Sequence, residues 1–284
     1  MEVTPKHTQA VSGWAAMEPS GEVVPFAFKR RENGVDDVTI KVHYCGMCHT
    51  DLHFINNDWG ITMYPLVPGH EITGVVTRVG ANVSGFRPGD RVGVGPMKQH
   101  GMLLGEPGRR LGVVGLGGLG HVAVKFGKAF GLKVTVISTS PAKEREARES
   151  LKADDFVLST DERQMQAMAR SLDYVIDTVS AQHSLGPILE LLKVNGKLVL
   201  VAAPDKPVEL PSFPLIFGKR TVSGSMTGGM KETQEMMDLC GEHGITADIE
   251  LVSTDGINDA LARLARNDVR YRFVVDVAGT GSRL

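Results

Sequence analysis

The sequence predicts an α/β protein with two parts, a mostly-β first part and a second part built on a doubly wound parallel sheet of the Rossmann type. Three observations support this prediction. Residues 1–95 contain short alternating runs separated by proline and glycine. From residue 96 to about 229, strand-like runs alternate with helical patterns, as in a parallel sheet covered by helices. A glycine-rich turn at Gly115–Gly120 joins one of these strands to a helix.

The composition excludes several classes of protein. At 284 residues, the chain is long enough for two domains with packed cores. Its net charge of −2 gives no basis for binding nucleic acid or an anionic membrane. It has no apolar run of about 18 residues and no signal-peptide pattern. The three cysteines are too few for a disulfide framework, so we expect a reducing, cytoplasmic location.

The elements of the first part follow from alternation. The run V-T-I-K-V-H-Y at Val38–Tyr44 alternates apolar and polar residues, which predicts a half-buried strand. Ile72–Val79 is a second expected strand. The turn F-R-P-G-D ends at Asp90, and a third strand begins over Arg91–Gly95.

Strands and helices are expected in turn along the second part. A helical pattern over His121–Phe130 follows the glycine turn, and Lys133–Ile137 is the next strand. The other expected strands are 156–158, 174–178 and 197–201, and the expected helices are 141–151, 161–171 and 184–192. The last segment predicts strands at 249–252 and 271–277 and helices at 257–264 and 231–243, the latter with Met236, Met237, Leu239 and Cys240 facing the core.

Three glycines of the stretch L-G-V-V-G-L-G-G-L-G have a mechanical reason. Gly115 permits the tight turn out of the strand, Gly117 lets the backbone approach a pyrophosphate, and Gly120 lets the helix pack closely on the sheet. The helix N-terminus favours the phosphates. The alternative is a glycine-rich turn without a ligand, but the flanking strand and helix favour a dinucleotide. Leu116, Gly118 and Leu119 complete this candidate site.

The cofactor is predicted at the end of the following strand. An NAD enzyme places an acidic residue there, about 20 residues after the glycine motif, to bind the ribose hydroxyls. This chain has Ser138, Thr139 and Ser140 and then Lys143, and hydroxyl donors with a cation suit a 2′-phosphate. NADP is therefore expected. The alternative is that the hydroxyls only cap the next helix, and Ser140 could do both.

Two clusters in the first part could bind a metal. They are Cys45-Gly46-Met47-Cys48-His49-Thr50-Asp51-Leu52-His53 and Pro68-Gly69-His70-Glu71. Cysteine thiolates and neutral imidazoles are zinc ligands. A single C-x-x-C pair is an incomplete signature, and Cys45 is better interpreted as a small buried residue. From spacing alone, His70 fits a ligand and a histidine bonded to a turn equally well.

Together these motifs resemble the plant cinnamyl alcohol dehydrogenases, which belong to the medium-chain, zinc-dependent alcohol dehydrogenases. The resemblance rests on G-W-A-A at Gly13–Ala16, on the two Cys/His clusters, and on V-V-G-L-G-G-L-G-H-V-A-V-K-F-G-K-A-F-G. It continues through L-D-Y-V-I-D-T-V and N-D-V-R-Y-R-F-V-V-D-V and covers essentially the whole chain. It implies a GroES-like catalytic domain over 1–95, a Rossmann domain over 96–229, and a segment 230–284 that returns to the catalytic domain.

The resemblance also implies roles for single residues. Cys48 and His70 correspond to zinc ligands, and Glu71 would lie beside the metal and could enter its coordination. Thr50 would hold the substrate hydroxyl next to the cofactor, and His53 would exchange the proton with solvent through the cofactor ribose. The role of His49 stays open. Further residues implied along NADP are Thr178, Ala202, Ser225, Met226 and Thr227.

The chain departs from the family pattern after Gly95. Family members carry there a block of several dozen residues with the four-cysteine lobe of a structural zinc, a cysteine that is the third catalytic ligand, and part of the substrate pocket. Only Cys240 remains beyond the first cluster. No structural zinc is therefore expected, and the catalytic zinc would keep Cys48 and His70, with Glu71 as a third ligand if it enters the coordination. His100 is a conceivable replacement ligand.

Two functions are carried forward. The first is a zinc-dependent NADP(H) oxidoreductase that interconverts cinnamyl-type alcohols and aldehydes, with Phe54, Trp59 and Ile61 in the substrate pocket and a homodimer formed through the edge near Thr221–Ser225. The alternative is a catalytically impaired NADP-binding protein, because the third ligand is absent. A zinc-free quinone-type reductase fits poorly, since Cys48 and His70 are retained.

Overall fold

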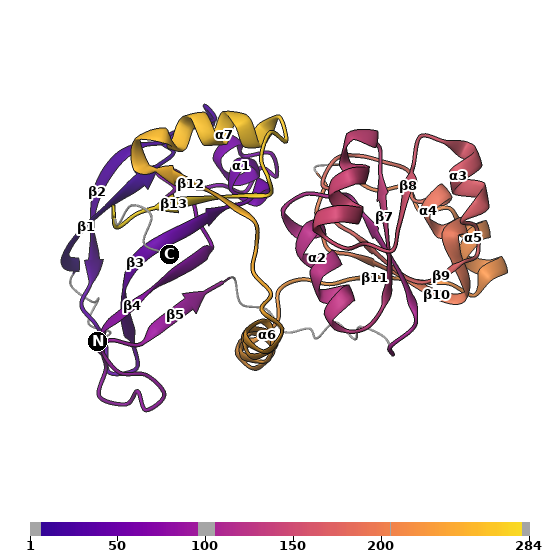
Figure 1. The fold of residues 1–284 in the computed structure, drawn as a ribbon. Coiled ribbons are helices and arrows are strands. Elements are labelled where there is room, and N and C mark those ends of the chain that lie inside the picture. The colour runs from indigo at the N-terminus through magenta and orange to yellow at the C-terminus, as the bar shows by residue number, and fades with distance from the viewer. Residues whose placement is uncertain (1–6, 96–105, 205, 280–284) are drawn as a thin grey trace. The chain divides into compact units, whose positions relative to one another are not determined.

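The computed structural model describes residues 7–95, 106–204 and 206–279. Within them the chain forms two compact units, one from residues 7–95 and 249–279 and the other from residues 106–248 (Figure 1). The predicted return to the first domain began at residue 230, whereas the chain re-enters that unit at Ile249. None of the described helices combines the length and apolar character needed to cross a bilayer.

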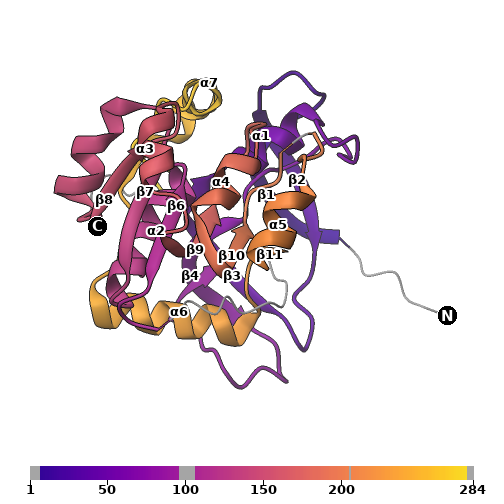
Figure 2. The same cartoon turned by 90° about the vertical axis from the view of Figure 1, so that its right-hand side faces the viewer.

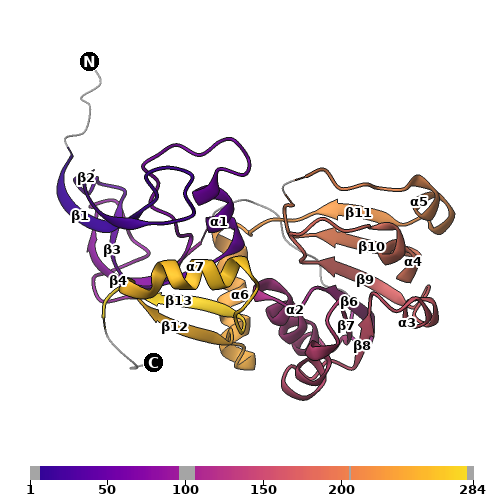
Figure 3. The ribbon, with the colours of Figure 1, turned by 90° about the horizontal axis from the view of Figure 1, so that it is seen from above.

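The first unit is a mostly-β body with two helices. Its five-stranded sheet has the order β12-β13-β3-β4-β5, and β1 and β2 form an antiparallel hairpin. The bounds are β1 His7–Ala15, β2 Val24–Arg31, β3 Val38–Met47, β4 Glu71–Val79, β5 Arg91–Val94, β12 Ile249–Ser253, β13 Arg272–Asp276, α1 His49–Asn56 and α7 Ile257–Ala265. Helix α7 lies across β12 and β13 (Figure 3), and Ile55, Leu261 and Phe273 are buried in the shared core.

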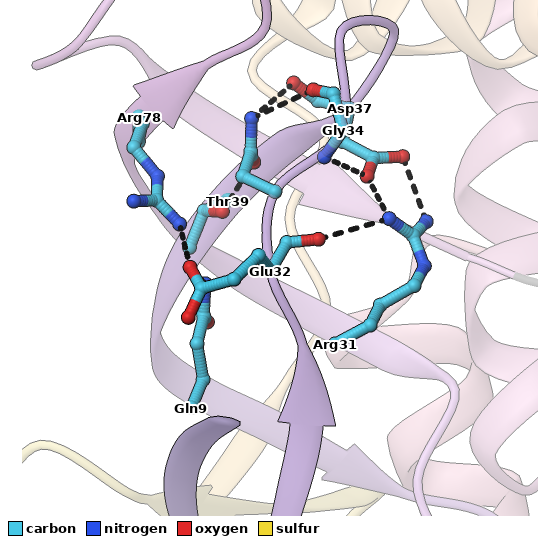
Figure 4. A network of polar contacts seen from close by, with 8 residues as sticks. Gln9, Arg31, Glu32, Gly34, Asp37, Thr39 and Arg78 are labelled. Carbon is cyan, nitrogen blue, oxygen red and sulfur yellow. Dashed lines mark hydrogen bonds and ion pairs between the residues drawn. The ribbon is translucent and has the colours of Figure 1, made fainter. Parts of the chain in front are cut away.

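A polar network joins the β1–β2 hairpin region to the neighbouring strands (Figure 4). The Glu32 carboxylate accepts hydrogen bonds from Gln9 at 3.0 Å and Arg78 at 3.3 Å. Arg31 pairs with Asp37 and lowers the pKa of that carboxyl group to about 2. Because these side chains are largely exposed, solvent screening limits what they contribute to stability.

The second unit is a six-stranded parallel sheet of the predicted doubly wound kind. Its order is β11-β10-β9-β6-β7-β8, so the direction of winding reverses between β6 and β9. The bounds of its strands are β6 Arg110–Val114, β7 Lys133–Ser138, β8 Asp155–Leu158, β9 Leu172–Asp177, β10 Leu192–Leu200 and β11 Thr221–Gly224. Its α-helices are α2 Gly118–Ala129, α3 Glu162–Ala167, α4 Gly186–Leu191, α5 Ser212–Gly218 and α6 Met230–His243.

Three helix predictions need correction. The helix expected at 141–151 is a 3-10 turn at Pro141–Lys143 followed by a π-helical turn at Glu146–Ser150, and the Ser140 side chain makes no capping bond. The helix expected at 161–171 ends at Ala167. Helix α6 (Figure 2) has no buried residue, and Met236 and Met237 are exposed rather than in the core. Periodicity shows that α6 has an apolar face, but it does not supply a partner for that face.

Close packing of helix α2 on the sheet depends on Gly120. A Cβ at this position would lie 2.1 Å from the carbonyl oxygen of Gly115. We expect Gly120→Ala to lower the free energy of unfolding by about 1–3 kcal/mol, because the backbone must shift. Gly241→Ala is the control, since a Cβ on that α6 glycine meets no atom within 4 Å. Urea unfolding monitored by circular dichroism measures both, and equal effects would contradict this packing.

Candidate functional site

The register of two antiparallel strands brings the predicted metal ligands together. Strand β3 pairs with β4 so that Gly46 lies opposite Glu71. The chain leaves β3 at Met47, and Cys48 then becomes the N-cap residue of α1. His70 directly precedes β4. The ligand atoms of Cys48, His70 and Glu71 therefore all lie within 4.8 Å of one another.

The donor set of this cluster fits zinc. A thiolate, an imidazole and a carboxylate are the three ligand types of zinc in proteins, and three protein ligands with one open position are usual for a catalytic ion. Within the described residues this is the group of three that could hold a metal ion. The alternative ligand His100 lies outside the described residues. Cys45 and Cys240 are not part of the cluster.

Asp51 holds the cluster together, a role that the sequence alone does not assign to it. Its buried carboxylate accepts hydrogen bonds from the backbone N–H of Cys48 at 2.8 Å and of Gly69 at 3.1 Å. The same group lies 3.0 Å from Nδ1 of His70. A carboxylate behind a metal-binding histidine orients the ring and makes it a better ligand. The available signal was an acidic residue three positions after the N-cap residue, where it can complete a capping box.

Electrostatics favour the thiolate form of Cys48. Burial raises the pKa of Cys48, but the hydrogen bond from His70 and the charge of Arg272 outweigh it, and the net pKa is lowered. The pKa of His70 is raised to about 10 by the hydrogen bond to Asp51 and then by that to Cys48. A metal ion that binds here must displace the imidazole proton, so binding would release protons.

Arg272 on β13 contacts the third residue of the cluster. Its Nε lies 3.4 Å from Glu71 Oε2, and its guanidinium donates to the carbonyl oxygen of Met47 at 2.9 Å. Arg272 is therefore ion-paired, and its side chain is buried. Cys45 lies in β3, and burial, followed by the charge of Asp51, raises its thiol pKa to about 11.

The two predicted catalytic residues lie on α1 behind the cluster. Thr50 Oγ1 is 3.6 Å from Cys48 Sγ. His53 Nδ1 is 2.7 Å from Asp58, while its Nε2 is buried and has no hydrogen-bond partner among the described residues. The His53 ring lies 4.9 Å from that of Trp59, which meets Phe54 edge to face. Burial, then the charges of His53 and Arg272, lower the pKa of His49.

The glycine turn of the second unit has the geometry that its sequence predicts. Gly115 has φ of +85°, in the left-handed region that favours glycine. Gly117 is the N-cap of α2, and a Cβ there would meet no atom within 4 Å. Thr178 Oγ1 donates to the carbonyl oxygen of Val114 at 2.8 Å, and Lys143 Nζ donates to that of Leu116 at 2.7 Å. These bonds tie the turn to the loop after β9 and to the 3-10 turn after β7.

The other predicted cofactor residues follow the carboxyl ends of the parallel strands. Ser138 ends β7 and is followed by Thr139 and Ser140, and the hydroxyl of Ser138 accepts a hydrogen bond from the Ser140 amide at 3.2 Å. Ala202 follows β10, and residues 225–227 follow β11. Because carboxyl ends of parallel strands lie at one edge, these residues gather where doubly wound sheets bind ligands. Thr50, which was also expected next to the cofactor, lies on α1 in the other unit.

Family models match most of the chain. The alcohol dehydrogenase GroES-like domain matches residues 34–130, and the zinc-binding dehydrogenase matches residues 118–242. A probable cinnamyl alcohol dehydrogenase from Oryza sativa subsp. japonica is 67% identical over 98% of this chain and 99% of its own. The chain belongs to the cinnamyl alcohol dehydrogenase family of zinc-dependent alcohol dehydrogenases. It is therefore an oxidoreductase by family, and the predicted fold class is confirmed.

Solved structures of family members agree. A cinnamyl alcohol dehydrogenase from Sorghum bicolor matches with a TM-score of 0.92 and 44% identity over 95% of this chain and 98% of its own. The Helicobacter pylori enzyme, complexed with NADP(H), matches with a TM-score of 0.86 and 27% identity over 96% and 99% of the two chains. The rice alignment extends over 356 residues, against 284 in this chain, so relatives carry residues that it lacks.

Asp51→Asn should change how stability depends on pH in the metal-free protein. The folded pKa of His70, about 10, lies above the usual value of about 6.5. The protonated pair therefore stabilises the fold below pH 6.5 or so, and this contribution is lost as pH rises towards 10. In Asp51→Asn the His70 pKa should fall and the loss should shrink. Urea unfolding from pH 6 to 10 or so measures this. Asp58→Asn is the control, and identical pH profiles for wild type and Asp51→Asn would contradict the assignment.

Proposed function

We propose that this chain is a zinc-dependent, NADP(H)-linked oxidoreductase that interconverts cinnamyl-type alcohols and aldehydes, as in monolignol supply. The observation that carries the proposal is the cluster of Cys48, His70 and Glu71 with Asp51 behind it. Family membership supports the reaction class. The names of the rice and sorghum relatives support the substrate class.

The residues of the first unit suit two parts of this reaction, binding of the substrate oxygen and transfer of the proton. Cys48, His70 and Glu71 would hold zinc, which when bound supplies Lewis-acid polarisation of the substrate oxygen. Thr50, beside Cys48, orients the substrate hydroxyl. His53 moves the proton at Nε2, while Asp58 holds its Nδ1. A buried ring nitrogen without a protein partner is costly unless another group meets it, which supports this role.

The residues of the second unit suit NADP(H). The open space at Gly117 and the N-terminus of α2 accommodate a diphosphate. Ser138, Thr139, Ser140 and Lys143 offer hydroxyls and a positive charge to a 2′-phosphate, with no carboxylate among them to repel it. The H. pylori relative with bound NADP(H) supports the same cofactor.

The aromatic pair near His53 supports an aryl substrate. Phe54 and Trp59 meet edge to face with 5.1 Å between ring centroids, next to the proposed proton-transfer group. A substrate ring that makes the same kind of contact with Phe54 or Trp59 would be stabilised in the same way. A probable mannitol dehydrogenase from Medicago sativa is 50% identical, and an 8-hydroxygeraniol dehydrogenase from Catharanthus roseus is 46% identical. Mannitol and 8-hydroxygeraniol are therefore the comparison substrates in an assay.

A second candidate function follows because the family pattern has a cysteine as third zinc ligand, which this chain lacks. If the ion pair with Arg272 keeps both carboxylate oxygens of Glu71 from the metal, only Cys48 and His70 remain for zinc. The chain would then bind NADP(H) without turnover. Reduction of coniferaldehyde by the zinc-loaded protein separates the two candidates, since measurable turnover excludes this one.

Zinc content tests the proposal directly. We expect native mass spectrometry of the folded protein to find one zinc per chain, and Cys48→Ala to lose it because two ligands bind zinc poorly. Cys240→Ala on α6 is the matched control and should keep the metal. Zinc-free wild-type protein that still binds NADPH would contradict the proposed enzyme.

Cofactor preference is tested at Ser140. We expect Ser140→Asp to weaken NADPH binding about tenfold or more, because a carboxylate repels the 2′-phosphate, and to change NADH binding little. Ser140→Asn is the control, because asparagine has the size of aspartate and no charge. Fluorescence titration with both nucleotides measures the affinities. An equal loss for NADPH and NADH would contradict the placement of the 2′-phosphate.

We also infer a homodimer through the outer edge of the second unit's sheet. Strand β11 is hydrogen-bonded only on its β10 side within the described residues. On the preceding α5, Phe213 and Phe217 stack at 5.8 Å and are 71% and 79% exposed. An unpaired edge beside exposed aromatic rings suits a second copy of the chain. A monomer in sedimentation at micromolar concentration would exclude this dimer.

A further inference from the structure

Helix α2 holds the segment Thr246–Asp248 with two side chains that lie one turn apart. His121 is fully buried, and its Nε2 lies 3.1 Å from the backbone N–H of Asp248. An amide N–H can only donate, so Nε2 accepts and the ring proton lies on Nδ1, which faces the Gly117 carbonyl oxygen at 3.1 Å. Lys125 Nζ donates to the Thr246 carbonyl oxygen at 2.8 Å and pairs with Asp248 at 2.9 Å.

The two ends of this anchor lead to the two candidate sites. Gly117 belongs to the proposed diphosphate turn. Asp248 directly precedes Ile249, the first residue of β12, and Ile249 pairs with Arg272 in the parallel β12–β13 ladder. Arg272 in turn contacts Glu71 of the metal cluster. Bonded and hydrogen-bonded contacts thus run from the glycine turn to a candidate metal ligand.

We propose that His121, supported by Lys125, is a positioning residue that couples nucleotide binding at the glycine turn to metal binding at Cys48, His70 and Glu71. The proposal rests on the proposed NADP(H) and zinc sites. A nucleotide that orders the Gly117 peptide also orders His121 and hence the start of β12. This favours the arrangement in which Arg272 fixes one carboxylate oxygen of Glu71, Oε2, and leaves the other for the metal. By linkage, zinc strengthens nucleotide binding by the same factor as nucleotide strengthens zinc binding.

Because His121 is buried, its hydrogen bond to the Asp248 amide contributes more than an exposed contact would. The ring is inaccessible to water, so removing its acceptor leaves the Asp248 amide with a lost bond that solvent replaces only by local opening. Lys125 is partly exposed and adds a bond that water can replace. Most of the anchoring is therefore assigned to His121.

Three substitutions separate the two bonds of the ring. His121→Leu removes both bonds and keeps an apolar side chain of similar size. His121→Asn reaches only the position of Nδ1 and can still donate to Gly117. His121→Gln places an amide oxygen near the position of Nε2 and can still accept from Asp248. Val124→Ala, at another buried position on α2, is the control for loss of packing alone.

Hydrogen exchange without nucleotide or zinc tests the anchor itself. Peptides that contain Asp248 should exchange about five- to tenfold faster in His121→Leu and His121→Asn than in the wild type. His121→Gln and Val124→Ala should stay near the wild-type rate. Unchanged exchange in His121→Leu would overturn the proposal, whether or not the protein binds NADPH.

Zinc competition against a chelator, with and without saturating NADPH, tests the coupling. In the wild type the zinc dissociation constant should fall about fivefold or more when NADPH is bound. In His121→Leu this change should vanish while zinc affinity without NADPH stays the same, and His121→Gln should restore it. Equal coupling in wild type and His121→Leu overturns the proposal. If NADPH does not quench the fluorescence of the wild-type protein, the nucleotide is not bound, and this result would instead count against the proposed function.

Discussion

The geometry of the candidate metal site depends on the hydrogen bonds of the buried Asp51 carboxylate. It accepts from the amides of Cys48 and Gly69 and orients the ring of His70, so one buried group ties the start of α1 to the loop before β4. A buried carboxylate is costly unless hydrogen bonds satisfy it, and here three donors do so. The His70 ring that Asp51 holds in place makes the hydrogen bond to Cys48 that favours the thiolate there. This preorganisation is what a metal site with few protein ligands most needs.

A second constraint shapes the unit that holds the glycine turn, where backbone must approach backbone. Gly120 packs against the carbonyl group of Gly115, and Gly115 itself adopts a left-handed φ. This contact and this backbone conformation put the N-terminus of α2 at the carboxyl edge of the sheet, next to the point where the winding reverses. The turn is then held on its other side by Thr178 and Lys143. The site follows from close packing rather than from any single strong bond.

Features with a local cause could be predicted from the sequence. The glycine turn and the strand alternation depend on neighbouring residues, and both are found where expected. The association of C-x-x-C-H with P-G-H-E is implied only by the family resemblance, because spacing alone leaves the role of His70 open. The ion pair of Arg272 with Glu71 could not be predicted, because the pairing of β13 with β3 and of β3 with β4 brings these two residues together. Helix α6 shows the opposite failure, since its methionine face is real but exposed. Asp51 was recognisable only as a capping residue, and its contact with His70 needs the fold.

The central claim is that Cys48, His70 and Glu71 can hold a catalytic zinc without the additional cysteine of the family pattern. X-ray absorption at the zinc edge of the loaded protein tests it most directly. We predict one sulfur neighbour, at about 2.3 Å, with nitrogen and oxygen in the other positions. Two sulfur neighbours would mean that Cys45 or Cys240 enters the site, and none would mean that zinc binds elsewhere. Either result would contradict the proposed centre.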